Sequence, residues 1–575
     1  MPKIRVLDWD TVNKIAAGEV VERPASVVKE LVENSIDAGA TKILIEVDEG
    51  GKRLVRVTDD GCGMDSDDIR LAFQKHSTSK IATAEDLERV ATLGFRGEAL
   101  SSIASVAREV EVRSKPRSLD PAVSGTYLRI DAGRVVEVRE TGCPLGTAIA
   151  VKDLFYNVPA RLKYLKSGSA ELARITKTVT DLAIINHSIS FELFSGKKTI
   201  LKTTRRERWD EAILSLFGRE VVKELIPLEV LAKRWTIRGL VSTHRLTRAS
   251  PDGIFIYVNR RLVLAKGIQR ALRDGYGNLI PHGRHPFALI SIEIDPRLID
   301  VNVHPTKREI RFLKEEEMAT SLTKAIGDLV HAEVTKTSGL KAVSEPGSRA
   351  VSIEKDSQRP LPFVVDSREE AKLEIAASDS SFDEKQPIRI LGQVLDLYIV
   401  GESERGLILI DQHAAAERVR YESLLCRHSR EGLRQELLDP MTLDLTPKEQ
   451  VLLDSWMELL ADIGFEIHHF GGCTYNVRAV PAIGSLIESP GAVHEVLMEL
   501  FSSGKVRPLS DDVDEALKLL ACRGSVKAGE KLERAEMYGL IEALYRCDNP
   551  WTCPHGRPTV VTVSKEQLEK IFGRR

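Results

Sequence analysis

The sequence predicts a multidomain α/β (α+β) protein in which two α/β domains precede a flexible linker and a third α/β domain. Three observations support this architecture. The chain has 575 residues, enough for about three or four domains of ~150 residues each. Helical and strand-like patterns occur on both sides of one polar stretch. That stretch, residues 336–387, is rich in Ser, Lys, Glu, Asp and Pro, so it cannot bury enough apolar surface to offset chain entropy.

The composition is that of an ordinary globular protein, with 42% apolar and 29% charged residues. No run approaches the ~18 apolar residues of a membrane span, and the N-terminus lacks the apolar core of a signal peptide. We therefore expect a cytoplasmic protein without a membrane partner, whose seven cysteines are reduced thiols or metal ligands. Because the net charge is −3, any affinity for DNA must come from a local basic patch.

The part before the linker divides near residue 218, which gives domains at 1–217 and 218–335. In the first domain, helices and strands are expected to form an α/β structure with a mixed or antiparallel sheet, and the second repeats the α/β pattern around one helix at 265–275. The expected helices of the first domain are 24–38, 67–76, 97–106 and 169–186, and its strands are 42–48, 53–58, 127–130 and 147–152.

The part after the linker, 388–575, begins with expected strands at 389–393, 396–401 and 406–410. A helix follows in the stretch DQHAAAERVRYE, residues 411–422. Thr446 and Glu449 then form the capping box of another helix. We expect residues 446–510 to be a small inserted helical/β subdomain.

A helix expected at 27–40 places Glu30 and Asn34 on one face, because residues four apart are neighbours on a helix. A carboxylate that activates water beside an amide oxygen that holds Mg²⁺ would suit this arrangement. Taken alone, the pair favours the plainer interpretation of a surface pair on a solvated helix face.

The segment after the next two expected strands adds to this site. Asp59 ends a strand and can accept a hydrogen bond from an exocyclic amine such as that of adenine, while Gly61 and Gly63 let a flat ring approach the backbone. Further on, a phosphate loop is expected, with backbone amides at the N-terminus of a helix that begins at Gly97. Its residues are Gly94, Phe95, Arg96, Gly97, Glu98 and Ala99, joined by Thr78, Ser79 and Lys80.

The stretch 411–422 contains candidate metal ligands. His413 and Glu417 are four residues apart on the expected helix, and Asp411 at the strand end can reach the same point. Glu422 is rotated by about 140° from Glu417, so we expect it to point away and to support the site. By spacing alone, the trio favours a hydrogen-bonded helix start over a metal site. Downstream, Cys522, Cys553 and His555 are residue types that suit Zn²⁺.

Three motifs resemble the nucleotide-binding motifs of the GHKL ATPases, which have the Bergerat ATP-binding α/β sandwich. They are E-x-x-x-N at 30–34, D-x-G-x-G at 59–63 and GFRGEAL at 94–100. Longer segments are similar almost residue for residue to one GHKL family, the MutL/HexB DNA mismatch repair proteins of bacteria. These segments are 15–40, 75–81, 153–166 and 300–312. Histidine kinases and gyrase B fit less well, because a phospho-acceptor helix and a Toprim domain are not found here. Hsp90 chaperones fit less well, because they would not carry the C-terminal motifs of this chain.

The resemblance implies an ATP hydrolase. Glu30 would be the general base, Asn34 the Mg²⁺ ligand and Asp59 the adenine contact. The triphosphate pocket and its lid would comprise Thr78–Lys80 and residues 94–99. Lys307 of the second, transducer domain would reach the γ-phosphate. Because a ligand shifts a conformation only through differential contacts, such a lysine would let ATP close the two N-terminal domains.

The C-terminal motifs are similar to those of MutL proteins that nick DNA themselves. The resemblance implies metal-site residues at Asp411, His413, Glu417, Cys522, Cys553 and His555, with Glu422 and Lys527 in support, and with Mn²⁺ and Zn²⁺ as the metals. The expected function is that of a mismatch repair ATPase and matchmaker with a latent metal-dependent endonuclease. The alternative is an ATP-switched DNA-binding and signalling protein that cuts nothing.

The expected partners are double-stranded DNA, the mismatch recognition protein MutS, the replicative sliding clamp, a helicase and a second copy of the chain, at the nucleoid. QELLDP at 435–440 resembles the Gln-x-x-Leu-x-Pro clamp-binding peptide, which assigns Gln435, Leu437, Leu438 and Pro440 to the clamp. Arg270 and Arg273 share one helix and can contact DNA phosphates, or simply form a solvated basic face.

Overall fold

The chain falls into two compact units in the computed structural model, Met1–Glu333 with Leu424–Leu520 and Val334–Ser423 with Ala521–Arg575. Most of the predicted linker, 338–387, lies outside the described residues, as do Lys80, Gly94, Phe95, Arg96, Lys307 and Lys527. The structure describes residues 21–75, 77–79, 97–118, 123–248, 251–281, 284–300, 310–337, 388–404, 406–430, 433–482, 489–502, 513–523, 531–572 and 574.

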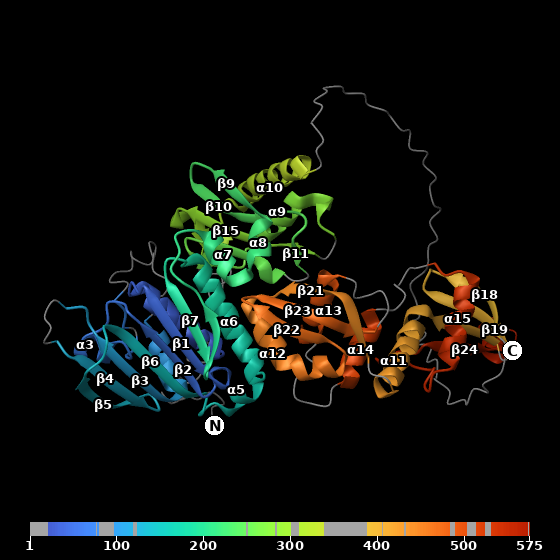
Figure 1. The fold of residues 1–575 in the computed structure, drawn as a ribbon, viewed down its shortest axis with the longest axis horizontal. Helices are drawn as coiled ribbons and strands as arrows, with labels where there is room; N and C mark the ends of the chain where they lie inside the picture. The colour runs from blue at the N-terminus through green and yellow to red at the C-terminus, as the bar shows by residue number, and fades with distance from the viewer. Residues whose placement is uncertain are drawn as a thin grey trace, which may run out of the picture. The chain divides into compact units, whose positions relative to one another are not determined.

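The first part of the first unit is built on one mixed sheet with the order β5-β4-β3-β6-β2-β1-β7-β8 (Figure 1). β1 runs antiparallel to β2 and parallel to β7, and the other neighbours are antiparallel. The strands are β1 (Lys42–Asp48), β2 (Leu54–Asp59), β3 (Ala107–Lys115), β4 (Gly125–Asp131), β5 (Arg134–Thr141), β6 (Gly146–Leu154), β7 (Ser190–Ser195) and β8 (Lys198–Lys202).

Helices cover this sheet because every second strand residue is apolar. Ile43, Ile45 and Val47 of β1 are buried, and helix α2 contacts β1, β2 and β6. α2 also packs on α6, which contacts β7. The helices here are α2 (Pro24–Asp37), α3 (Ser66–Leu71), α4 (Ala99–Val106), α5 (Pro159–Tyr164), α6 (Gly168–Ile185), α7 (Trp209–Phe217) and α8 (Arg219–Lys223).

Two helix boundaries differ from the sequence expectation. The helix expected over 67–76 ends at Leu71, where a turn with a hydrogen bond from Gln74 N to Leu71 O (2.9 Å) begins. The helix expected from Gly97 starts at Ala99, because Gly97 has a φ of +62° that no helical residue adopts.

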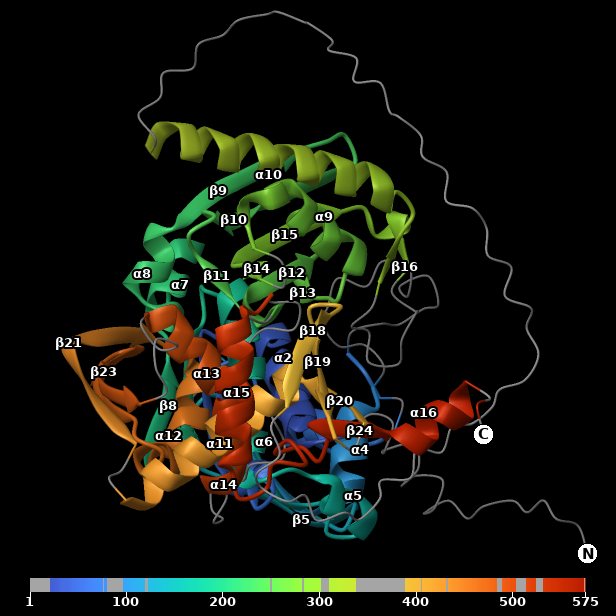
Figure 2. The same ribbon diagram turned by 90° about the vertical axis from the view of Figure 1, so that its right-hand side faces the viewer.

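The second part of this unit has a sheet with the order β13-β12-β15-β10-β9, which α9 and α10 cover (Figure 2). Apolar residues of both helices join the strands in one core, among them Leu272 of α9 and Leu322 of α10. The elements are β9 (Leu225–Leu231), β10 (Trp235–Ser242), β12 (Ile254–Val258), β13 (Arg261–Leu262), β15 (Ala288–Ile294), α9 (Lys266–Tyr276) and α10 (Glu315–Thr337), with short pairs β11 (Thr247–Arg248) with β14 (His285–Pro286) and β16 (Ile299–Asp300) with β17 (Arg311–Phe312).

Residues 433–523 contribute a smaller sheet with the order β21-β23-β22 and flanking helices. The capping box expected at Thr446 and Glu449 starts α12, and Trp456 lies on the buried face of this helix. The elements are β21 (Arg434–Asp444), β22 (Glu466–Gly471), β23 (Thr474–Pro481), α12 (Pro447–Asp462), α13 (Pro490–Ser502) and α14 (Val513–Arg523).

The second unit has a sheet with the order β18-β19-β20-β24. Apolar residues of these strands share a core with Ala415 of α11 and with Met537, Ile541 and Leu544 of α15. Its elements are β18 (Arg389–Val394), β19 (Tyr398–Ser403), β20 (Gly406–Asp411), β24 (Val560–Ser564), α11 (Gln412–Arg430), α15 (Arg534–Tyr545) and α16 (Lys565–Ile571). Among the described residues, no helix has the length and apolarity needed to cross a membrane.

Candidate functional site

Helix α2 carries Glu30 and Asn34 on its partly exposed side. The helix begins with Pro24 at its first position, where a missing N–H costs nothing. Val28, Leu31 and Val32 are buried against the sheet. Because these residues fix the rotation of the helix, Glu30 and Asn34 both stay half-buried at its rim, one turn apart as the spacing predicts.

Asp59 ends β2 directly beside this helix. Its Oδ2 accepts a hydrogen bond from Ser35 Oγ at 2.7 Å, and its Oδ1 accepts from Gly61 N at 2.9 Å and Thr147 N at 3.2 Å. Burial raises the pKa of Asp59, and these hydrogen bonds oppose that rise. Sequence reasoning missed Ser35, which fixes the carboxylate to the helix of Glu30 and Asn34, although its place next to Asn34 was a usable signal.

Gly61 and Gly63 are needed by the chain itself. A Cβ on Gly63, whose φ is +70°, would lie 2.1 Å from Lys115 O. A Cβ on Gly61 would lie 2.9 Å from the Ala38 side chain, and Cys62 N donates to Ala38 O at 3.0 Å. Gly61 thus lets this loop lie against Ala38 just after α2, and Gly63 lets it lie against Lys115 at the end of β3. The ring approach expected from the sequence stays a prediction beside these contacts.

The described parts of the expected phosphate loop lie against each other. A Cβ on Gly97 would be 2.6 Å from Ser77 O, so only glycine lets the start of the α4 segment approach the chain at Ser77. Thr78 and Ser79 follow directly, and Glu98 and Ala99 follow Gly97. The two predicted phosphate-binding segments are therefore neighbours, whereas Lys80, Gly94, Phe95, Arg96 and Lys307 are outside the described residues.

In the second unit, Asp411 ends β20, and His413 and Glu417 lie on the first turns of α11. Asp411 Oδ1 accepts from His413 N at 2.9 Å and from Ala414 N at 3.0 Å, so this carboxylate caps the helix. His413 Nε2 lies 3.3 Å from Glu417 Oε1, and the Glu417 side chain is 6% exposed. The trio is thus a hydrogen-bonded helix start, in which the His413 and Glu417 side chains also lie against each other.

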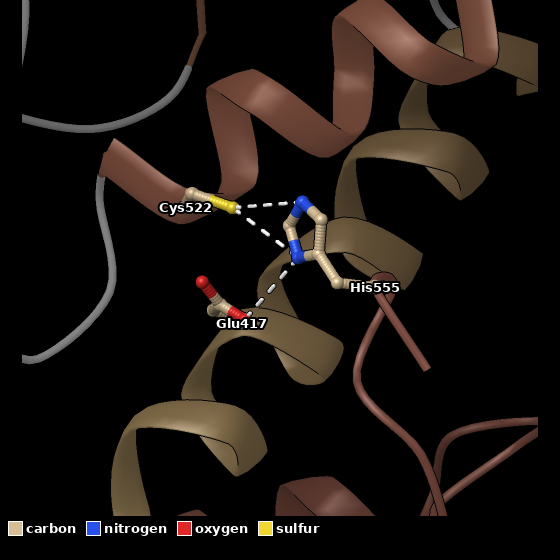
Figure 3. A group of neighbouring side chains, drawn as sticks. All are labelled: Glu417, Cys522 and His555. Carbon is tan, nitrogen blue, oxygen red and sulfur yellow. Dashed lines mark hydrogen bonds and ion pairs between the residues drawn. The ribbon is translucent and has the colours of Figure 1, made fainter. Parts of the chain in front are cut away.

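Cys522 and His555 meet Glu417 at this point (Figure 3). His555 Nδ1 lies 3.8 Å from Cys522 Sγ and 3.6 Å from Glu417 Oε2. One ligand atom from each residue fits within 4.8 Å of the others. Tetrahedral ligands bound at ~2.1–2.3 Å lie roughly 3.4–3.8 Å apart, so this thiol, imidazole and carboxylate set fits a zinc-sized ion.

The remaining predicted C-terminal residues lie elsewhere. Cys553 is buried and its N donates to Arg557 O at 2.8 Å. Within the described chain, the group that can hold a metal includes none of Asp411, His413 and Cys553. The nearby Cys547 thiol donates to Ala543 O at 3.5 Å, and burial raises its pKa to about 12.

Glu422 turns away from Glu417, as its spacing predicts. Its carboxylate accepts from two backbone amides, Asp548 N at 2.6 Å and Asn549 N at 3.1 Å. Arg418, which the sequence analysis did not single out, lies beside it, with Nη1 at 3.4 Å from Glu422 Oε1. The four-residue spacing of this pair was the signal that could have revealed it.

The predicted clamp-binding segment interrupts the ladder between β21 and β23, whose register shifts between Glu436 and Met441. Gln435 and Pro440 are exposed, Leu437 is half-buried, and Leu438 is 99% exposed. The register shift is a β-bulge, which changes the direction of side chains, and Leu438 points into solvent.

Arg270 and Arg273 are both exposed on α9, opposite the buried Ala271 and Leu272. The Arg273 guanidinium lies 3.1 Å from His285 Nδ1.

Comparison with known proteins accounts for the whole chain. Three family models match, described as "Histidine kinase-, DNA gyrase B-, and HSP90-like ATPase" at residues 22–123, "DNA mismatch repair protein, C-terminal domain" at 213–331, and "MutL C terminal dimerisation domain" at 391–532. The mismatch repair model matches the domain that precedes the linker. The dimerisation model matches the domain that follows the linker, and it supports a homodimer held together by that domain.

Full-length relatives agree. The chain is 49% identical to the DNA mismatch repair protein MutL of Methanothrix thermoacetophila and 41% identical to that of Methanoculleus marisnigri, each over 100% of both chains. The solved Aquifex aeolicus MutL ATPase domain complexed with ADP is 26% identical, with a TM-score of 0.38, over 53% of this chain and 98% of that chain. With an ATPase domain at one end, a dimerisation domain at the other and relatives of this identity along its full length, the chain belongs to the MutL family of DNA mismatch repair proteins.

Proposed function

We propose that this MutL-family ATPase hydrolyses ATP at the site around α2, with Glu30 as the general base. Glu30 projects from the rim of a helix that the sheet fixes, and Asn34 offers an amide oxygen to Mg²⁺ one turn away. Asp59, held by Ser35 and two backbone amides, is oriented to accept a hydrogen bond from the adenine amine. The bound nucleotide would supply the phosphoanhydride bond that is cleaved. Glu30 would position and deprotonate the attacking water.

The phosphate contacts of this proposal come from two segments. Thr78 and Ser79 with Lys80 form one, and residues 94–99 form the other. Their support is the approach of Gly97 to Ser77, which brings both segments to one place. Lys307 of the transducer domain, 218–335, completes the site at the γ-phosphate, and Gly61 and Gly63 shape the wall beside adenine.

We further propose a metal-dependent strand-nicking site in the domain 388–575. The observation that carries it is the convergence of Glu417, Cys522 and His555 from three separate segments. His413 lies against Glu417 and extends the donor set toward Asp411. A divalent metal held there would polarise a phosphodiester and lower the pKa of a bound water. Mn²⁺ suits carboxylate donors, and Zn²⁺ suits thiol and imidazole donors. Cys553 would be a further thiol donor at this site.

Nicking of supercoiled plasmid in Mn²⁺ tests this proposal. Asp411→Asn is the sharpest variant, because asparagine caps a helix about as well as aspartate and only the charge is lost. Wild type should relax the plasmid, and Asp411→Asn should do so at least about 10-fold more slowly. Equal rates would refute a role for Asp411 at the metal site.

The competing proposal is an ATP switch that binds DNA and signals without cutting. One observation favours it: Asp411 already has a structural task as the helix cap. Plasmid that stays supercoiled with wild-type protein, in Mn²⁺ and with ATP, would select this alternative.

The proposed partners follow from exposed groups and from the family. We propose a matchmaker role between MutS and downstream repair, including a helicase, in the cytoplasm at the nucleoid. The exposed Leu438, with Gln435, Leu437 and Pro440, would dock on the sliding clamp. Arg270 and Arg273 would contact DNA phosphates.

A further inference from the structure

The loop between α15 and β24, residues 546–559, carries Cys553 and His555 but contains no regular helix or strand. Of the three residues that converge on the candidate metal site, Glu417 and Cys522 stand on helices and His555 stands on this loop. A ligand on an irregular loop keeps its position only if other contacts fix the backbone that carries it.

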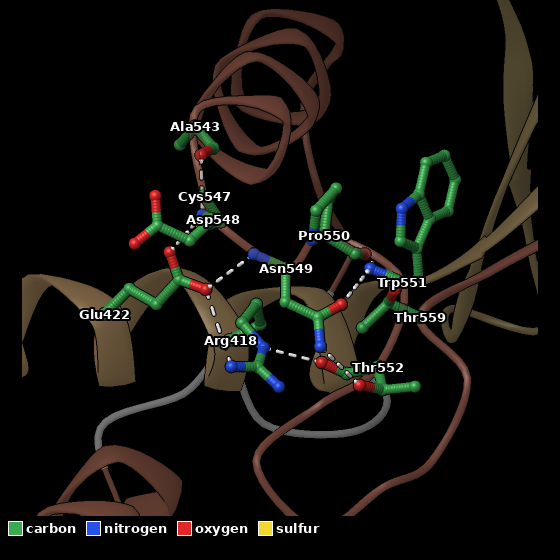
Figure 4. A network of polar contacts seen from close by, with 10 residues as sticks. All are labelled: Arg418, Glu422, Ala543, Cys547, Asp548, Asn549, Pro550, Trp551, Thr552 and Thr559. Atoms are coloured by element: carbon green, nitrogen blue, oxygen red, sulfur yellow. Dashed lines mark hydrogen bonds and ion pairs between the residues drawn. The ribbon is translucent and has the colours of Figure 1, made fainter. Parts of the chain in front are cut away.

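Two side chains of α11 fix that backbone (Figure 4). Glu422 accepts from Asp548 N at 2.6 Å and from Asn549 N at 3.1 Å. Arg418 Nε donates to Thr552 O at 2.5 Å, and Arg418 Nη1 lies 3.4 Å from Glu422 Oε1. The Arg418–Glu422 ion pair therefore binds the loop backbone at both ends of the stretch 548–552. Its hydrogen bonds are charge-assisted and so are stronger than neutral ones.

Hydrogen bonds inside the loop connect the backbone that Arg418 and Glu422 hold to the segment that carries His555. Asn549 Nδ2 donates to Thr552 Oγ1 at 3.2 Å, and Trp551 N donates to Asn549 Oδ1 at 3.2 Å. Beyond Thr552, Cys553 N donates to Arg557 O at 2.8 Å, and Gly556 N donates to Cys553 O at 2.9 Å. These bonds close a turn around His555, so its position follows from that of Thr552.

The pair is also shielded from solvent, with the Arg418 side chain 10% and the Glu422 side chain 17% exposed. Arg418 directly follows Glu417 in the sequence, and on a helix neighbouring residues diverge by about 100°. The same two turns of α11 therefore present the candidate ligand Glu417 on one side and the loop-binding residues Arg418 and Glu422 on the other.

We propose that Arg418 and Glu422 are positioning residues for the metal site: they hold the loop 548–552 so that His555 meets Glu417 and Cys522. Glu422 does this through the backbone amides that occupy its oxygens and not as a metal ligand. This inference rests on the proposed metal site.

Co²⁺ titration of the full-length protein tests it, because thiolate bound to Co²⁺ gives a charge-transfer band and the visible bands report ligand geometry. Glu422→Gln keeps the shape but loses the charge that Asp548 N, Asn549 N and Arg418 share. It should bind Co²⁺ about 10- to 100-fold more weakly, with altered visible bands at saturation. The control is Glu542→Gln, because Glu542 pairs with Arg546 at the same four-residue spacing but is 66% exposed on α15; its titration should match wild type.

A ligand variant separates the two ideas. Cys522→Ser should abolish the thiolate band; a wild-type band in that variant would overturn the metal site itself. If Cys522→Ser loses the band while Glu422→Gln titrates as wild type, the positioning role is wrong and the metal site stands. Should Glu422→Gln lose its near-UV circular dichroism and prove unfolded, Arg418→Lys decides, because lysine keeps the charge but cannot bond Thr552 O and Glu422 in the same geometry. Unchanged Co²⁺ affinity in Arg418→Lys would likewise overturn the positioning role.

Discussion

At the scale of single residues, Glu30 and Asn34 show how far spacing alone carries a prediction. Their shared helix face followed from the sequence, and α2 has the expected rotation because Val28, Leu31 and Val32 are buried. The distant partners of Ser35 and Arg418 could not be predicted from local spacing: Ser35 donates to Asp59, and Arg418 donates to Thr552. Long-range partners of this kind depend on which strands pair, and periodicity does not reveal that.

Glu30→Gln should bind ATP normally but hydrolyse it about 10²- to 10⁴-fold more slowly, the range that a general base contributes. The amide keeps the size of the side chain and cannot accept a proton. Single-turnover hydrolysis and nucleotide binding measured side by side check this. The control is Glu22→Gln, an exposed carboxylate just before the helix. Turnover of Glu30→Gln equal to that of the control would remove Glu30 as the base.

Asp59→Asn should separate stability from function. Burial raises the pKa of Asp59 in the folded protein, so the ionised carboxylate costs stability, and that cost appears as the pH rises through the folded pKa. Asparagine carries no charge and can still accept from Gly61 N and Thr147 N. The variant should therefore melt at least as high as wild type at neutral pH, with an advantage that vanishes in acid.

ATP affinity of Asp59→Asn should meanwhile fall roughly 10- to 100-fold, from the ~1.5–3 kcal/mol of a hydrogen bond to a charged group. Thermal melts across pH, together with nucleotide titration, check both halves. A variant that melts lower than wild type at neutral pH, or one that binds ATP equally well, would contradict the corresponding half.

At the scale of elements, local signals predicted the presence of helices and strands better than their exact bounds. The capping box at Thr446 is present, and the strand expected at 42–48 has those bounds. α4 starts two residues late, because Gly97 is needed at positive φ against Ser77, a tertiary reason that its sequence neighbours do not encode. The same holds for Gly61 and Gly63, whose tight contacts are with Ala38 and Lys115.

The bulged part of β21 supports a prediction at this scale. Leu438→Ala should weaken binding to the sliding clamp by roughly 30-fold, the ~2 kcal/mol of an interface hot spot. It should leave the melting temperature unchanged, because Leu438 is 99% exposed. Phe470→Ala is the matched control, since Phe470 is a 72% exposed apolar residue of the same sheet. Clamp affinity that drops equally in both variants, or in neither, would exclude Leu438 as the anchor.

At the scale of the whole molecule, the nucleotide residues belong to one compact unit and the candidate metal ligands to the other. An ion that binds only the folded form stabilises its own unit, by ~2.7 kcal/mol at 100 times its Kd. Separate units need not melt together. Removing Zn²⁺ with a selective chelator, in excess Mg²⁺ so that the ATPase keeps its ion, should therefore lower one calorimetric transition and leave the other in place.

Basal ATP turnover should be unchanged by that treatment, because Glu30, Asn34 and Asp59 belong to one compact unit and Glu417, Cys522 and His555 to the other. Re-adding Zn²⁺ should restore the lowered transition in wild type but not in Cys522→Ser, which ties the effect to the thiolate. If chelation instead stops ATP turnover, or lowers both transitions together, the metal supports the nucleotide site as well, and the assignment of one chemistry to each unit is wrong.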